Sequence, residues 1–133
     1  MMIDLMPRVL ESIKKIDTHT IEIRYKEKVN VTVSDMREIL DTVYEFTENK
    51  PVKRLVVITD GSSLELKARL LLQEENKIRK DYILAEAVLV NSLAQKMLTN
   101  FYLKFIKDSF PSKFFTDYDK ALEWIKEQPV PKY

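Results

Sequence analysis

The chain has 133 residues, 22 of them basic and 21 acidic, and a formal net charge of +1. It contains one glycine, one histidine and no cysteine. These counts exclude a Walker A loop, a GxGxxG dinucleotide turn, a GxSxG nucleophile elbow, a disulfide framework, a thiolate zinc site and a histidine-rich metal cluster. The length and a hydrophobic content of 45% predict one globular domain over residues 1–133, with its core at about residues 8–127.

The first elements predict a hairpin. Residues 20–26 alternate between an apolar face and a charged face, as a half-buried strand does (Ile21, Ile23 and Tyr25 against Glu22, Arg24 and Lys26). A less regular strand over residues 8–16 precedes it, and residues 17–20 form the turn. Next, Thr32 and Asp35 predict a capping box that starts a helix ending at residues 49–51.

The middle of the chain predicts a strand, a turn and a second helix. Residues 55–58 are apolar on both faces, which is typical of a central strand. A glycine-containing turn follows, and Ser62 with Glu65 predicts a capping box for a helix over about residues 64–77. Its leucines predict either burial under a neighbouring helix or a surface for a partner: Leu64, Leu66, Leu70, Leu71 and Leu72.

The last third of the chain repeats this pattern. Residues 82–90 predict a second strand buried on both faces, and Ser92 with Gln95 predicts the start of a third helix. Residues 113–115 form a short strand, and Thr116 with Asp119 predicts the cap of a last helix. The order is therefore β-β-α-β-α-β-α-β-α, an α/β fold with a mainly parallel sheet and an antiparallel N-terminal hairpin.

Two blocks of sequence carry a resemblance to a known fold. Residues 85–94, Ala-Glu-Ala-Val-Leu-Val-Asn-Ser-Leu-Ala, and the ending over residues 114–125 resemble the STAS superfamily of SpoIIAA-type anti-sigma-factor antagonists. The chain is most similar to the uncharacterised bacterial branch called SpoIIAA-like or STAS/SEC14-like, over about residues 8–127. In the antagonists, a partner kinase phosphorylates a serine in the loop after the third strand. The matching loop here is Asp60-Gly61-Ser62-Ser63, in which the glycine precedes the serines instead of following them.

This turn is the strongest candidate binding or phospho-acceptor site: Asp60, Gly61, Ser62 and Ser63. It follows a central strand and precedes a helix, whose free amides favour an anion. The plainer interpretation is that Ser62 only caps the helix. Asn91 and Ser92 follow the other buried strand, and we expect the two turns to meet at one edge of the sheet.

Other candidates carry less weight. Glu86 interrupts an apolar strand, so it is either a buried base or cation ligand, or a carboxylate that reaches solvent or pairs with a lysine. His19 lies in the predicted hairpin turn, where a solvated side chain is favoured over a catalytic one. Lysines alternate with aromatic residues near the C-terminus, but the small net charge argues against nucleic-acid binding.

The sequence therefore favours a non-enzymatic regulatory or interaction domain of the SpoIIAA-like type, with recognition at the turn of residues 60–63 and regulation by phosphorylation. Its partner is another protein or a second copy of the chain. The alternative function is a carrier that holds a lipid-like or other apolar small molecule between helices and sheet. We expect no cofactor and no metal. The absence of a secretory signal and of a long apolar stretch predicts a cytoplasmic location without membrane insertion.

Overall fold

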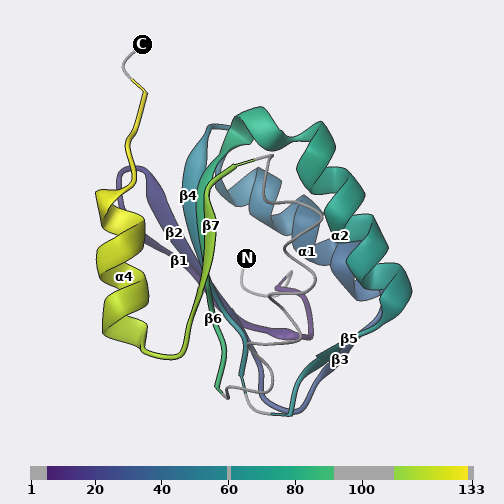
Figure 1. Cartoon of the computed structure of the whole chain (residues 1–133). Helices are drawn as coiled ribbons and strands as arrows, with labels where there is room; N and C mark the ends of the chain where they lie inside the picture. The colour runs from purple at the N-terminus through teal and green to yellow at the C-terminus, as the bar shows by residue number, and fades with distance from the viewer. Residues whose placement is uncertain (1–5, 60, 92–109, 132–133) are drawn as a thin grey trace.

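The computed structural model of the chain describes residues 6–59, 61–91 and 110–131 (Figure 1). Its elements follow in the order β1 (Leu10–Asp17), β2 (Thr20–Tyr25), β3 (Asn30–Val31), α1 (Val33–Phe46), β4 (Val52–Val57), β5 (Ser63–Leu64), α2 (Leu66–Ile78), η2 (Lys80–Tyr82), β6 (Ile83–Leu89), β7 (Ser112–Phe115) and α4 (Tyr118–Glu127). The third helix, which the sequence predicts from Ser92 onward, lies outside the described residues.

The main sheet has five strands in the order β1-β2-β4-β6-β7. β1 and β2 pair as an antiparallel hairpin, whereas β2 with β4, β4 with β6, and β6 with β7 are parallel pairs. The predicted fold class is therefore confirmed. β4 and β6 lie inside the sheet, and helices cover both of its faces, which explains why their sequences show no polar side.

The helices divide into two layers (Figure 1). α1 and α2 lie together on one face of the main sheet, and α4 lies on the opposite face, against β4, β6 and β7. Each face has its own apolar core. The α1 face buries Ile21, Ile23, Tyr25, Met36, Ile39, Leu40 and Val43, among others, and the α4 face buries Leu55, Val57, Ala85, Ala87, Leu89, Ala121 and Ile125.

A second, two-stranded sheet joins β3 and β5 in parallel, with Asn30 opposite Ser63 and Val31 opposite Leu64. The sequence did not predict it, because two-residue strands are too short to show alternation. Its consequence for the serine turn is direct. Ser63 and Leu64 belong to a strand, so the turn does not run straight into a helix.

α1 begins as the sequence predicts. The Thr32 hydroxyl accepts a hydrogen bond from the Asp35 amide, and the Asp35 carboxylate accepts one from the Thr32 amide. Burial by itself raises the pKa of Asp35, but the hydrogen bonds from Thr32 and the charge of Arg8, 2.7 Å away, outweigh it and lower the pKa below its usual range. The helix ends at Phe46, three residues before the predicted end, and Glu48 and Asn49 adopt positive φ.

The predicted start of α2 is wrong. The helix begins at Leu66 with Glu65 as its N-cap residue, and no side chain caps it. Its exposure also differs from the prediction, because Leu66 and Leu70 are 69% and 54% exposed while Ala68 and Asn76 are buried. The side of α2 that faces the protein interior therefore carries fewer leucines than the sequence suggested.

Two further expectations need correction. Glu22, assigned to the solvent side of β2, is 0% exposed, because α4 covers that face of the sheet. The cap of α4 is Asp117 rather than Thr116, and its carboxylate accepts a hydrogen bond from the Lys120 amide at 3.1 Å. Within the described residues, no helix combines the length and the apolar character needed to cross a bilayer.

Candidate functional site

The turn after β4 needs its glycine. Gly61 has a φ of +72°, which L side chains rarely adopt, and a Cβ placed there would lie 3.0 Å from the Lys28 Cγ atom. The turn is therefore packed closely against the segment between β2 and β3. Asp60, the first residue of the predicted site, lies outside the described residues.

Ser62 fastens this turn to the chain that leaves β2. Its hydroxyl donates to the Lys26 carbonyl at 2.8 Å, and the Thr59 hydroxyl donates to the same carbonyl at 2.7 Å. The predicted helix-capping role of Ser62 is wrong, because the side chain turns toward Lys26 and away from the start of α2. Ser62 is half-buried.

Ser63 lies at the surface, in β5. Its hydroxyl donates to the Asn30 side-chain oxygen at 2.8 Å, and its amide donates to the Val29 carbonyl at 2.9 Å. Of the two serines, only Ser63 is exposed. It is therefore the one that an enzyme or a partner could reach without unfolding the turn.

The second predicted turn follows β6 at the same edge of the sheet. β4 and β6 are neighbouring parallel strands, so their carboxyl ends lie side by side, and the Ile58 amide donates to the Leu89 carbonyl at 2.9 Å. Asn91 is exposed at this edge, and Ser92 lies outside the described residues. Asn91 is not among the described residues around the cavity beside the serine turn, so a joint site of the two turns remains a prediction.

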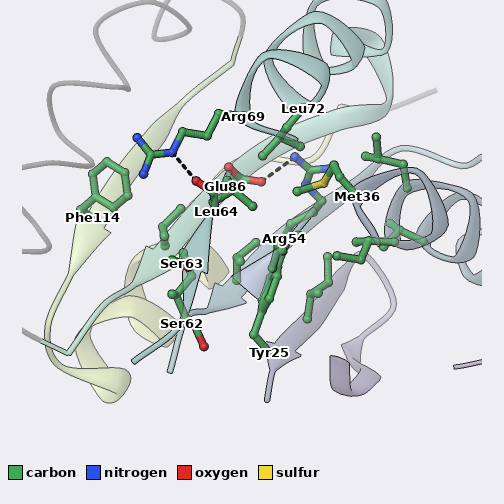
Figure 2. Close-up of a pocket in the computed structure, with 18 residues that line it drawn as sticks. Tyr25, Met36, Arg54, Ser62, Ser63, Leu64, Arg69, Leu72, Glu86 and Phe114 are labelled. Atoms are coloured by element: carbon green, nitrogen blue, oxygen red, sulfur yellow. Dashed lines mark hydrogen bonds and ion pairs between the residues drawn. The ribbon is translucent and has the colours of Figure 1, made fainter. Parts of the chain in front are cut away.

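That cavity lies between the main sheet and the helices α1 and α2, and its volume is about 310 Å³ (Figure 2). Figure 2 shows Ser62, Ser63, Arg69 and Phe114 along one side of it and Met36 on the other. Most of the described lining residues are apolar: Ile23, Tyr25, Val31, Met36, Ile39, Leu40, Val43, Val56, Ile58, Leu64, Leu72, Val88 and Phe114. The cavity thus offers a small molecule mainly hydrophobic contacts.

A buried ion pair interrupts this apolar lining. Arg54 of β4 and Glu86 of β6 are directly opposite in the sheet, and the guanidinium donates to the Glu86 carboxylate at 2.5 Å. Figure 2 shows the two side chains turned toward one another. The same guanidinium nitrogen donates to the Asn76 side-chain oxygen at 3.3 Å. Glu86 therefore neither reaches solvent nor pairs with a lysine.

The ion pair leaves hydrogen-bond donors unused. Among the described residues, neither the Arg54 Nε–H nor the Asn76 Nδ2 group has an acceptor, although both residues are buried. A buried donor without an acceptor is rare in folded proteins and costs free energy. The sequence analysis missed Arg54, since a single arginine before an apolar run looks like a strand end. Its spacing from Val56 and Ile58, which share its face, is the signal that could have revealed it.

A second buried carboxylate lies on the α4 face. The Tyr118 hydroxyl donates to Glu22 at 2.5 Å, and the Arg24 Nε donates to it at 3.3 Å. Burial and the hydrogen bond to Glu22 raise the pKa of Tyr118 to about 12. This network holds α4 to β2 and has no connection to the cavity on the other face.

The structure places His19 away from both. It is exposed in the β1–β2 turn, where its amide donates to Asp17 and its carbonyl accepts from the Lys53 amide at the start of β4. Ser62 follows the opposite end of β4. His19 therefore cannot complete a serine-centred catalytic arrangement with Ser62. The described residues contain no cluster of three or more histidine or acidic side chains able to hold a metal ion.

Comparisons with known proteins agree with this architecture. A solved structure from Shewanella loihica PV-4, an uncharacterised protein of the DUF3478 family with a SpoIIAA-like fold, aligns with a TM-score of 0.64. It is 17% identical and covers 86% of this chain and 90% of its own. At that identity the likeness shows the fold alone, and it confirms the SpoIIAA-like fold predicted from the sequence. No curated protein sequence matches the chain. The model of the family described as "Domain of unknown function (DUF7793)" matches residues 15–128, so this SpoIIAA-like chain belongs to that family.

Proposed function

We propose that this protein is a non-enzymatic binding domain that holds a small apolar molecule in the cavity between the sheet and α1 and α2. The observation that carries the proposal is the cavity itself, with a volume of about 310 Å³ and a mainly apolar lining. Pockets that bind small molecules have volumes of about 300–1,000 Å³ and a similar predominance of hydrophobic side chains. The proposal corresponds to the carrier alternative of the sequence analysis.

Physical chemistry favours an occupant over an empty space. Side chains that line an unfilled apolar cavity lose the dispersion contacts that a close-packed interior provides. Apolar cavities of about 150 Å³, half this volume, remain dry and bind molecules such as benzene. An apolar molecule that enters the cavity leaves water and restores these contacts, so both effects favour its binding.

The test combines extraction with a fluorescent probe. Protein purified without detergent is extracted with organic solvent, and the extract is analysed by mass spectrometry. The emptied protein is then titrated with N-phenyl-1-naphthylamine, an uncharged apolar dye that fluoresces more strongly in apolar surroundings. We expect saturable binding of one dye per chain.

A matched pair of substitutions locates the dye. Val56→Phe adds a ring inside the cavity, and Val33→Phe makes the same change at an α1 residue that is 42% exposed and is not part of the lining. We expect Val56→Phe to weaken dye binding at least about tenfold, a change of about 1.4 kcal/mol, and Val33→Phe to leave it unchanged. Absence of saturable binding to the wild type, or equal effects of the two variants, would refute the proposal.

The exposed serine supports a second candidate function, recognition at the turn, as the resemblance to the antagonists suggests. Ser63 is exposed in β5, and β5 and its partner β3 form a two-stranded sheet whose outer edges could pair with another strand. The partner to test first is a second copy of the chain, by sedimentation equilibrium. Ser63→Asp should reduce a measured dimer fraction, since it adds charge at this edge, while the exposed Ser34→Asp should not. A monomeric wild type would exclude this partner.

A further inference from the structure

We propose that the molecule in the cavity carries an uncharged hydrogen-bond acceptor, such as a ketone or ester oxygen, that binds the Nε–H of Arg54. This inference rests on the proposed function and specifies the chemistry of its ligand. It follows from the unused donor of Arg54, from the charge balance around it and from the apolar remainder of the lining.

The donor is buried and available. Arg54 is 4% exposed and lines the cavity, and its Nη2 nitrogen is shared between Glu86 and Asn76. Its Nε–H has no acceptor in the part of the chain that the structure describes. Hydrogen bonds to a charged group are stronger than those between neutral groups. An acceptor from a ligand would therefore gain a strong bond and relieve an unsatisfied buried group at once.

Charge balance selects an uncharged acceptor over a carboxylate. Glu86 is 7% exposed and compensates the positive charge of Arg54 inside the cavity. The other charged lining residue, Arg69, is exposed and donates to the Leu64 carbonyl at 3.0 Å. A ligand carboxylate beside Arg54 would be buried near Glu86, so like-charge repulsion and lost hydration would oppose its binding. A ketone or ester oxygen accepts the same hydrogen bond without these costs.

Three probes of equal chain length test the inference on the wild-type protein. Decane, 2-decanone and decanoate compete with N-phenyl-1-naphthylamine at pH 8, where decanoate is ionised. We expect 2-decanone to displace the dye at a concentration at least about tenfold lower than decane, because it adds one hydrogen bond to a charged donor. Decanoate should bind more weakly than 2-decanone.

Two variants then ask whether the ion pair sets this preference. Arg54→Met combined with Glu86→Leu replaces the pair with apolar side chains, and the advantage of 2-decanone over decane should fall to less than about twofold. Glu86→Gln retains the shape of the side chain but removes its charge, so the uncompensated Arg54 should shift the preference from 2-decanone to decanoate. Circular dichroism establishes that each variant is folded before its titration.

The outcomes separate the two proposals. If no dye binds to the wild type, the proposed function itself fails. If the dye binds but 2-decanone competes no better than decane, or decanoate competes best, the cavity binds apolar molecules and the inference about the acceptor is wrong. If neither variant folds, the wild-type order of the three probes still decides.

Discussion

Breaking the buried pair of Arg54 and Glu86 should destabilise the protein severely. Arg54→Met removes the cation and leaves the Glu86 carboxylate, 7% exposed, without its partner. At an effective dielectric constant of about 20, two unit charges about 4 Å apart attract by about 4 kcal/mol. Removing one member of a buried ion pair costs about 3–5 kcal/mol in other proteins. We therefore expect the free energy of unfolding to fall by about 4 kcal/mol, a large part of the roughly 5–15 kcal/mol available to a small domain.

The measurement is urea unfolding followed by circular dichroism, with two further proteins for comparison. Arg37→Met makes the same substitution in an exposed pair, Arg37 with Glu75 at 3.3 Å, and should cost at most about 1 kcal/mol. The double variant Arg54→Met, Glu86→Leu removes both charges and should recover most of the loss. The reasoning is refuted if Arg54→Met costs no more than Arg37→Met, or if the double variant is as unstable as the single one.

Three further predictions concern the contacts that fix the fold. Tyr118→Phe removes the hydrogen bond to the buried Glu22 and should cost about 1–3 kcal/mol in urea unfolding. Because the folded protein raises the pKa of Tyr118 from 10.0 to about 12, the wild type should lose this contribution as the pH rises from about 10 to 12, and Tyr118→Phe should lack that loss. Thr32→Ala should lower the free energy of unfolding by about 1 kcal/mol through loss of the helix cap, whereas Thr32→Ser should preserve it. Gly61→Ala should cost at least about 1 kcal/mol, from positive φ and crowding against Lys28, and an unchanged urea midpoint would contradict the backbone geometry.

Most of the fold could be predicted from local signals. The capping box at Thr32 starts α1, the continuous apolar runs mark β4 and β6, and alternation with helices implies parallel crossovers. Each of these signals lies within a few residues in the sequence. The candidate site was predicted less well. Ser62 and Ser63 do lie beside the cavity, but hydrogen bonds to Lys26 and Asn30, far away in the sequence, hold their side chains.

The sequence by itself determined which segments form the main strands and helices, because periodicity and end signals depend on neighbouring residues. Only the tertiary structure decided which polar groups are buried. Glu22 is buried because α4 packs on its face of the sheet, and Glu86 meets Arg54 because β4 and β6 are paired in that register. The cavity has the same origin, since its lining comes from five strands and two helices that the sequence separates. Burial is a property of what packs on a residue, and the residue's own neighbours in the chain do not specify it.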